Sequence, residues 1–413
     1  MKKILLASLL ISFLFSGMHT FSQDYTMEFS TDSIEFIEQI GNMLEKDKVH
    51  GKEGKEFMEK FEELWYSRIS NDNRIKIIDF SNKLLDRRAK DYPHFFNYFQ
   101  ITKYFIDTEH DTSSVHAWEK TLDELLGNRK MHLSKINDFL ENSLALITEN
   151  FLVKSPVASW KIYSRDFKYE YGKEGLKLIV GKTDLVCYAK RDSINVYDTK
   201  GVYYPVQKKW YGEHATIYWD RLEYQRNELN ATFGNYQIEM NTSGFTVDTA
   251  SLTNTRFFDE KILGSLEYQV ANIIRINQAK YPQFTSFENR YKLKNIYEDV
   301  DYIGGFSIEG AKFIGSGTEK EKAFVHMYRE VELIENNDTI LKDILFLIAA
   351  SKYYVFTQNR IASRNTEITM QLEEDSIYHP GLTFRFDNST RELTLLRDED
   401  PGSMSKSKYY NTY

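Results

Sequence analysis

Residues 156–180 read PVASWKIYSRDFKYEYGKEGLKLIV, and within them the spacing of the apolar residues changes. After Trp160 the pattern approaches a period of two, most clearly in Phe167-Lys-Tyr-Glu-Tyr171 and Leu176-Lys-Leu-Ile-Val180. Alternation of apolar and polar residues is typical of a half-buried β-strand. Pro156 precedes this change, so it marks a predicted boundary between two regions of different secondary structure.

The region before this boundary, residues 23–155, is predicted to be helical. From Thr31 to about Leu152 the apolar residues recur every three or four positions, which favours amphipathic helices. The first two stripes are Ile34, Ile37, Ile40 and Leu44, then Phe57, Phe61, Leu64 and Trp65. We expect five or six antiparallel helices with short links, forming either a bundle or a short helical-repeat domain.

The region after the boundary, residues 156–413, is predicted to be all-β, which makes the chain α+β. Short strands follow one another through polar turns such as Asn-Thr-Ser-Gly at 241–244. Such spacing indicates antiparallel pairing, and a stacked β-repeat or solenoid is favoured over a sandwich. The last stretch, Ser403–Tyr413, offers no capping element. An open stack would leave an exposed edge strand there, so we expect the chain to be shortened or to pair with something.

The first 22 residues resemble a secretory signal peptide. Lys2 and Lys3 precede an apolar stretch from Ile4 to Phe15, and Thr20-Phe21-Ser22 suits a leader peptidase. The apolar stretch is too short to span a membrane, which takes roughly 20 residues. The mature chain is therefore predicted to begin near Gln23, without a transmembrane segment, and to be exported to the periplasm, the cell surface or the medium.

Cysteine content and net charge limit the possible chemistry and partners. Cys187 is the only cysteine, so an intrachain disulfide is impossible, and its apolar surroundings favour a buried structural thiol over a nucleophile. No cysteine near the predicted cleavage site could carry a lipid anchor. The formal charge of −8 argues against nucleic acid as a partner, because phosphate contacts need clustered Lys and Arg.

Motifs for catalysis are weak in this sequence. No His-Glu-x-x-His pattern occurs, and the histidines are scattered, so neither a metal site nor a cofactor is predicted. Glu373 and Asp375 would share one face of a strand, and a carboxylate pair is what glycoside cleavage requires. A charged turn explains the same residues, and we favour the turn.

Aromatic residues give the better candidate for binding. Trp210, Tyr211, Tyr218 and Trp219 lie within ten residues around Gly212. If their rings were exposed, they would form a flat platform on which sugar rings could stack. If Trp219 and its neighbours face the β core, the same residues are packing residues, and we favour packing.

Three stretches resemble large exported, uncharacterised β-rich proteins of Gram-negative bacterial envelopes. They are Lys208-Lys-Trp-Tyr-Gly-Glu-His-Ala-Thr-Ile-Tyr-Trp219, Gly305-Phe-Ser-Ile-Glu-Gly-Ala-Lys-Phe-Ile-Gly-Ser-Gly317 and Asp375-Ser-Ile-Tyr-His-Pro-Gly381. The similarity extends from about Trp160 onwards and brings no established activity or site residue with it. The resemblance implies relatives longer than this chain.

Together these patterns predict an exported, non-enzymatic envelope or surface protein that serves as a scaffold or binding surface. An extracellular carbohydrate-active enzyme is the first alternative, and a lipid- or glycolipid-handling β structure is the second. The expected partners are accordingly a glycan, a lipid or another envelope protein.

Overall fold

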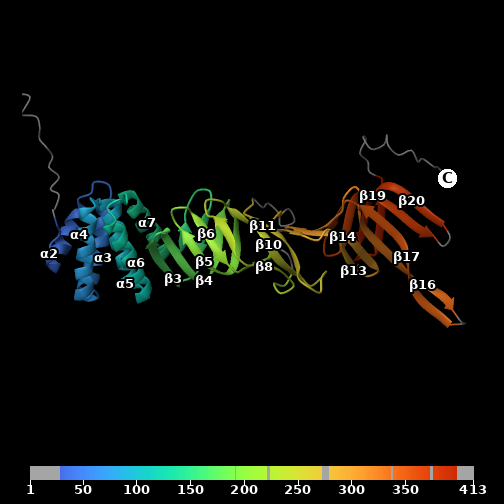
Figure 1. Ribbon diagram of the computed structural model, residues 1–413, viewed down its shortest axis with the longest axis horizontal. Helices are drawn as coiled ribbons and strands as arrows, with labels where there is room; N and C mark the ends of the chain where they lie inside the picture. Colours follow the sequence, from blue (N-terminus) through green and yellow to red (C-terminus); the bar gives the residue numbers. More distant parts are fainter. Residues whose placement is uncertain are drawn as a thin grey trace, which may run out of the picture. The chain divides into compact units, whose positions relative to one another are not determined.

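The computed structural model describes residues 28–190, 192–220, 224–271, 279–335, 338–372 and 375–397. Within these ranges helices come first and a large antiparallel β region follows, so the α+β prediction is confirmed (Figure 1). The predicted leader (residues 1–22), Glu373 and the stretch Ser403–Tyr413 lie outside the described residues.

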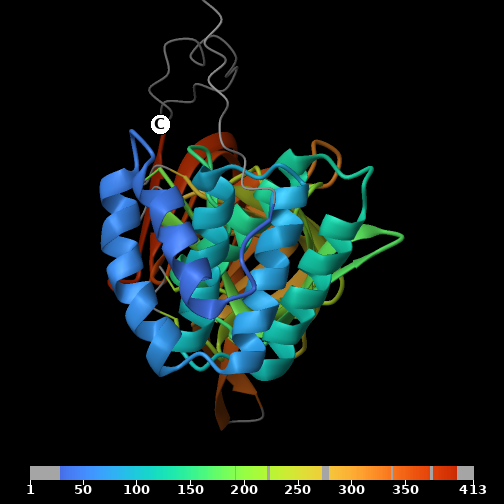
Figure 2. The same ribbon diagram turned by 90° about the vertical axis from the view of Figure 1, so that its left-hand side faces the viewer.

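The helical part contains α-helices of three to five turns and one short π turn. In chain order these elements are α2 (Ser33–Glu45), α3 (Gly51–Ser67), α4 (Asn71–Asp86), η1 (Asp91–Phe95), α5 (Phe96–Asp107), α6 (Thr112–Gly127) and α7 (Leu133–Glu149). Figure 2 shows α2 to α5 side by side. Asp32 caps the start of α2, because its Oδ1 accepts hydrogen bonds from the backbone N–H groups of Ile34 and Glu35.

Aromatic rings fill the core between these helices. Phe36 of α2 lies 5.4 Å from Trp65 of α3 and 6.4 Å from Phe99 of α5, measured between ring centroids. The predicted stripe of α2 was wrong at Ile34, which is exposed, while Phe36 is fully buried. Either residue could begin the apolar stripe of α2. Packing against Trp65 of α3 places Phe36, and not Ile34, in the core.

Gly54 lies inside α3, where it faces α2. A Cβ atom at this position would lie 2.6 Å from the carbonyl oxygen of Leu44. The backbone of α2 therefore approaches α3 closely, and only a glycine leaves room for that approach.

The chain forms two compact units, and the division between them falls within α6 and α7. One unit includes residues up to His110 together with Leu122–Glu141, and the other includes Asp111–Thr121 and the chain from Asn142. The start of α6 belongs with the strands because Ser114 Oγ donates to the carbonyl oxygen of Phe167 at 3.0 Å. The change of secondary structure near Pro156 and the division into units are thus separate features.

The β region consists of strands that mostly pair with near neighbours in sequence. They are β1 (Phe151–Val153), β2 (Ser159–Ile162), β3 (Phe167–Gly172), β4 (Gly175–Ala189), β5 (Asp192–Tyr204), β6 (Lys209–Glu213), β7 (Ala215–Tyr218), β8 (Leu229–Phe233), β9 (Tyr236–Glu239), β10 (Gly244–Asn254), β11 (Ile262–Gln269), β12 (Gln283–Ser286), β13 (Tyr291–Tyr297), β14 (Val300–Glu309), β15 (Lys312–Ser316), β16 (Ala323–Glu335), β17 (Asp338–Ser351), β18 (Tyr353–Phe356), β19 (Arg360–Leu372), β20 (Asp375–Asp387) and β21 (Glu392–Leu396). Every pairing among them is antiparallel.

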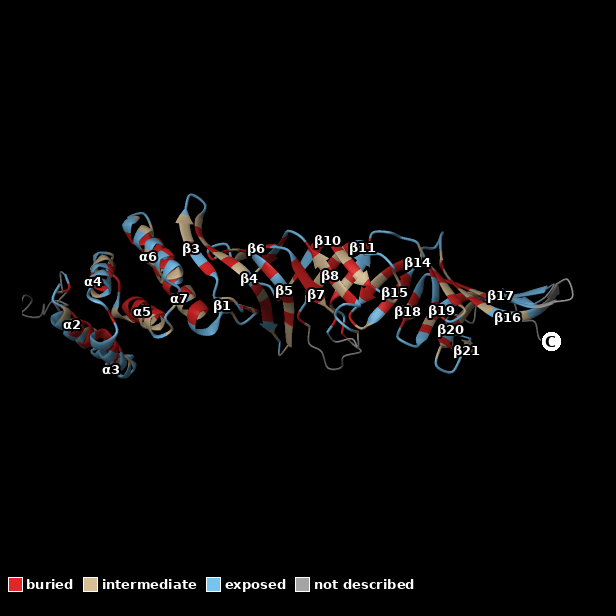
Figure 3. Ribbon diagram, turned by 90° about the horizontal axis from the view of Figure 1, so that it is seen from below, coloured by how far each residue is buried: buried red, intermediate tan, exposed pale blue. Residues whose placement is uncertain are grey.

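Buried and exposed residues alternate along these strands, as the period of two predicted (Figure 3). The pattern is regular in the first half of β4, where Leu176, Leu178 and Val180 are buried. β4 is longer than the predicted strand at 176–180, because it continues through Cys187. The β core is thus built from the inward residues of successive antiparallel strands.

Candidate functional site

The four aromatic residues of the predicted platform do not share an exposed face. Trp210 and Tyr211 are neighbours on β6, so their side chains point to opposite faces of the strand. Trp210 is 0% exposed and Trp219 is 3% exposed, whereas Tyr211 is 45% exposed. Tyr218 is partly buried and lies against the guanidinium group of Arg226, 4.6 Å from the ring centroid. Neither indole is therefore available to stack on a sugar.

Only one member of the predicted carboxylate pair can be placed. Asp375 is the first residue of β20, is exposed and lies opposite Leu372 of β19. Glu373 falls outside the described residues.

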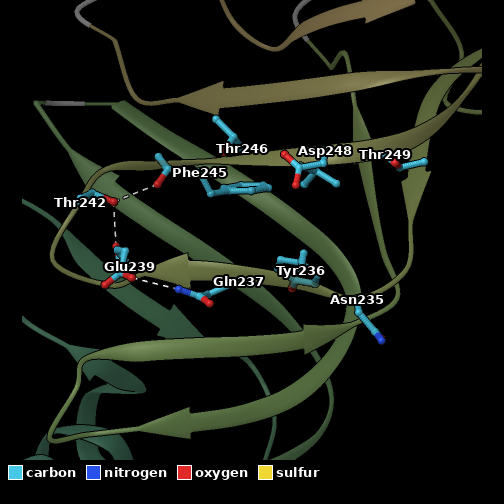
Figure 4. Close-up of a pocket in the computed structure, with 11 residues that line it drawn as sticks. Asn235, Tyr236, Gln237, Glu239, Thr242, Phe245, Thr246, Asp248 and Thr249 are labelled. Carbon is cyan, nitrogen blue, oxygen red and sulfur yellow. Dashed lines mark hydrogen bonds between the residues drawn. The ribbon is translucent and has the colours of Figure 1, made fainter. Parts of the chain in front are cut away.

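A cleft is found elsewhere, between β9 and β10. Its lining residues come from Asn235–Glu239 on one side and Gly244–Thr249 on the other, together with Thr242 of the connecting turn (Figure 4). We call this feature the β9–β10 cleft. Its volume is about 490 Å³, which lies within the usual range for ligand sites.

The β9–β10 cleft exists because two strands that follow one another in the chain diverge. Among the described strands β9 pairs with β6, whereas β10 pairs with β11 from Gly244 to Leu252. The second half of β10 pairs with β8, from Ser251 to Asn254. The strand formed by β8 and β9 bends at Gly234–Asn235, and beyond this bend β9 leaves β10 for another sheet.

The turn at 240–243 closes one end of the cleft. The Thr242 hydroxyl lies 2.7 Å from the carbonyl oxygen of Glu239 and 2.9 Å from that of Gly244, and it donates to one of them at a time. The Nε1–H of Trp160 donates to the carbonyl oxygen of Thr242 at 3.0 Å. These bonds hold the turn in place. The backbone of β9 between the bend and the turn lines the cleft.

Ladder alternation determines which backbone groups line the cleft. Met240 N–H bonds to the carbonyl of Lys208, and therefore the even-numbered residues of β9 make the hydrogen bonds to β6. The same argument applies to β10. The Val270 N–H donates to the carbonyl oxygen of Ser243, so residues 243, 245 and 247 make the hydrogen bonds to β11. The N–H and C=O groups of Gln237, Glu239, Gly244 and Thr246 consequently point into the cleft.

Aromatic side chains close the inner side of the cleft. The rings of Tyr236 and Phe245 lie 6.1 Å apart between centroids, and both residues are buried. The Tyr236 hydroxyl accepts a hydrogen bond from Trp210 Nε1 and lies 2.7 Å from Thr199 Oγ1. Burial raises the pKa of Tyr236 to about 12, so its hydroxyl stays neutral at physiological pH.

Polar and acidic side chains form the outer rim. Gln237, Glu239, Thr246 and Asp248 alternate with the buried residues of the two strands and face outward. Glu239 is neutralised by Lys209 Nζ at 2.8 Å and accepts a hydrogen bond from Gln237 Nε2 at 3.0 Å. Asp248 forms no ion pair with any residue that the structure describes. The rim thus keeps one uncompensated negative charge.

A second surface feature is the end of the β16–β17 hairpin. Pairing with β14 stops at Met327 and pairing with β19 starts at Leu347. Between these points Arg329–Glu335 and Asp338–Ile344 pair only with each other among the described strands. We call these two segments the β16–β17 arm, and Figure 1 shows that it extends beyond its neighbours.

The arm carries apolar side chains in water. Ile340, Leu341 and Ile344 are all exposed. Exposed apolar residues continue onto the neighbouring ends of β19 and β20, namely Leu372, Ile377 and Tyr378. The register joins these groups, because Leu347 lies opposite Met370 and Met370 lies opposite Ile377.

Other predicted features have the following places in the structure. Cys187 is fully buried, and burial raises the pKa of its thiol to about 12. Over the described ranges, His, Cys, Asp and Glu side chains form no group of three or more that could hold a metal ion. The described helices include none with the length and apolar character that a membrane span requires.

Comparison with known proteins gives no match: neither a family model, nor a curated protein, nor a solved structure matches the chain. Sequence patterns had also missed the β9–β10 cleft. The turn Asn-Thr-Ser-Gly at 241–244 was recognised, but a turn between two alternating segments predicts a paired hairpin. Only the bend signal Gly234-Asn235 hinted that the strands separate.

Proposed function

We propose that the chain is an exported, non-enzymatic scaffold of the cell envelope that binds a partner protein through the β16–β17 arm. The leader pattern of residues 1–22 supports export, and the resemblance to exported β-rich envelope proteins supports the location. A stacked β architecture is part of the proposal, and it is supported by strands that pair mostly with partners one or two places along the chain.

The observation that carries the proposal is the cluster of exposed apolar residues on and beside the arm. Single exposed apolar residues are common on proteins, whereas contiguous ones mark interaction surfaces. Here Ile340 and Ile344 lie on one face of an exposed strand and Leu341 lies on the other, so both faces of the arm carry exposed apolar side chains. A partner protein that covers them would remove this apolar surface from water.

The backbone and the charges of the arm favour the same interpretation. A two-stranded ribbon is marginally stable in water by itself, and neither outer edge of the arm pairs with another strand that the structure describes. Glu330 lies directly opposite Asp343, and like charges in this position destabilise a strand pair. A partner with basic groups at this position would relieve the repulsion while its apolar residues cover Leu341.

The test compares cross-linking from two equally exposed apolar positions. A photoreactive benzoylphenylalanine replaces Leu341, which is 60% exposed, or Val206, which is 63% exposed on the β5–β6 turn. In cells that produce the full chain, irradiation should give a discrete protein adduct from position 341 and none from position 206. The adduct should disappear when Asp343, which lies on the same face of β17 as Leu341, is changed to Lys, because the added positive charge repels a basic partner.

Circular dichroism of each purified variant checks that the chain has folded. The same adducts from positions 341 and 206 would contradict the proposal, as would a fully folded chain that gives no protein adduct from position 341. An adduct with lipid or glycan from position 341 would favour the corresponding alternative.

A further inference from the structure

We propose that the β9–β10 cleft binds a short extended segment of another polypeptide, which adds as a strand between β9 and β10. The proposal goes beyond the arm, uses none of its residues and stands or falls independently of it. It commits to one occupant, a peptide in extended conformation with a basic side chain at an outward position.

Unpaired backbone on both walls of the cleft is the first reason. Gln237 presents its N–H group from β9, and Thr246 presents its own from β10. Beside the turn the cleft is too narrow for a strand, because the carbonyl oxygens of Glu239 and Gly244 both lie within 2.9 Å of the Thr242 hydroxyl. The backbone N–H of Thr242 donates to the carbonyl oxygen of Glu239, and its hydroxyl can donate to that of Gly244, so the acceptors offered to a ligand are those of Gln237 and Thr246. A strand edge recognises any extended backbone through such groups, and here two edges face one cavity.

The direction and length of the added segment follow from the geometry of the walls. β9 runs towards the turn and β10 runs away from it, so an added strand is antiparallel to one wall and parallel to the other. Both kinds of pairing satisfy the backbone. The walls are four to six residues long, and at about 3.3 Å per residue they accommodate a segment of roughly 13–20 Å.

The inner and outer sides of the cleft select different side chains. Tyr236 and Phe245 already occupy the inner side, so inward residues of the segment have to be small. On the outer side Asp248 carries a charge without a partner among the described residues, and Lys209 neutralises Glu239. A Lys or Arg of the segment is therefore attracted to Asp248, while a Glu or Asp is repelled.

Hydrogen–deuterium exchange of the full chain, read by mass spectrometry over residues 235–249, tests the proposal. The probe is a capped hexapeptide of alternating Lys and Val, and the first control replaces each Lys by Glu. The second control keeps the Lys residues and N-methylates alternate backbone amides. We expect the Lys–Val peptide to slow exchange in this segment, and the two controls to leave it unchanged.

Two variants of the protein test the two recognition elements separately. Thr246→Pro removes an N–H group that points into the cleft and makes no bond to β11, and it should weaken binding about tenfold or more, the change that about 1.4 kcal/mol produces. Asp248→Lys should transfer the preference from the Lys peptide to the Glu peptide. That preference should shrink in 0.5 M salt, where the Debye length falls to about 4 Å.

Each result has a defined meaning for the proposal. If Thr246→Pro unfolds the chain, Asp248→Lys still decides, because the Asp248 side chain is exposed and forms no ion pair with a described residue. Equal binding of the N-methylated and unmodified peptides would overturn strand addition. Protection of residues 235–249 by an oligosaccharide, with no response to the Lys–Val peptide, would also overturn it.

Discussion

The Nε1–H of Trp210 donates a hydrogen bond to the hydroxyl of Tyr236 at 3.1 Å and thereby joins the inner faces of β6 and β9. Thr199 of β5 completes the group, since its Oγ1 lies 2.7 Å from the same hydroxyl. All three side chains are buried, so the Trp210 N–H depends on the Tyr236 hydroxyl for its hydrogen bond. Thr199 Oγ1 also lies 3.4 Å from the carbonyl oxygen of Lys200. The indole that the sequence offered as a binding platform thus helps to hold the inner side of the β9–β10 cleft.

Tyr236→Phe should lower the free energy of unfolding of the β region by about 1–3 kcal/mol, because it leaves the Trp210 N–H without its acceptor. Urea unfolding followed by tryptophan fluorescence measures the change. Tyr211→Phe is the matched control: its ring is 45% exposed, and it should change the free energy by less than about 0.5 kcal/mol. Equal effects of the two variants would show that the hydrogen-bonded group contributes nothing.

Gly212→Ala should also destabilise the β region, by about 1–3 kcal/mol. A Cβ atom at Gly212 would lie 2.2 Å from the ring of Tyr236, which faces it across the β6–β9 pair. Gly234→Ala is the control, because a Cβ there meets no atom within 4 Å. Thermal unfolding of both variants measures the difference, and a Gly212→Ala chain as stable as the control would contradict this packing.

The thiol of Cys187 should not react with a disulfide reagent at pH 8 until the chain unfolds. Burial raises its pKa to about 12, against about 8.5 in an unfolded chain. Because the thiol pKa is higher in the folded chain, the stability that the protonated thiol contributes is fully present below pH 8.5. It is lost as the pH rises above that value. The free energy of unfolding should therefore fall between pH 8.5 and 9.5, less steeply in Cys187→Ala. Rapid labelling of the native chain would refute the burial.

Lowering the pH should weaken the helical unit through His94. Burial, and then the charge of Lys90, lower the pKa of this imidazole below its usual value. The unfolded chain therefore binds a proton more readily, and stability is lost as the pH falls below about 6.5. Denaturant unfolding at pH 7.5 and 5.5 measures the loss, which His94→Gln should reduce. An identical loss in that variant would assign the pH dependence to other groups.

The prediction of the fold from sequence succeeded where the pattern is local. The period of the apolar residues identified the helices before Leu152 and the strands after Trp160, because each period corresponds to one backbone geometry. It was less reliable for faces and ends. Ile34 and Phe36 were equally suitable for the core of α2, yet only Phe36 is buried.

The candidate sites show the same limit. Alternation states that Trp210 and Tyr211 face opposite sides of β6, but not which of them faces the core. That choice depends on Tyr236 and Thr199, which come from two other strands. No property of residues 208–219 alone could have decided it.

By itself, the sequence determined the α+β order, the antiparallel strands and the burial of the single cysteine, because these depend on the spacing and chemistry of neighbouring residues. Only the tertiary structure decided that β9 leaves β10 at Gly234–Asn235 and that the β16–β17 arm extends past its neighbours. The reason is that strand pairing is a choice among partners distant in the chain. A local pattern predicts that a segment is a strand, but whether its edge is paired depends on strands that are distant in the sequence.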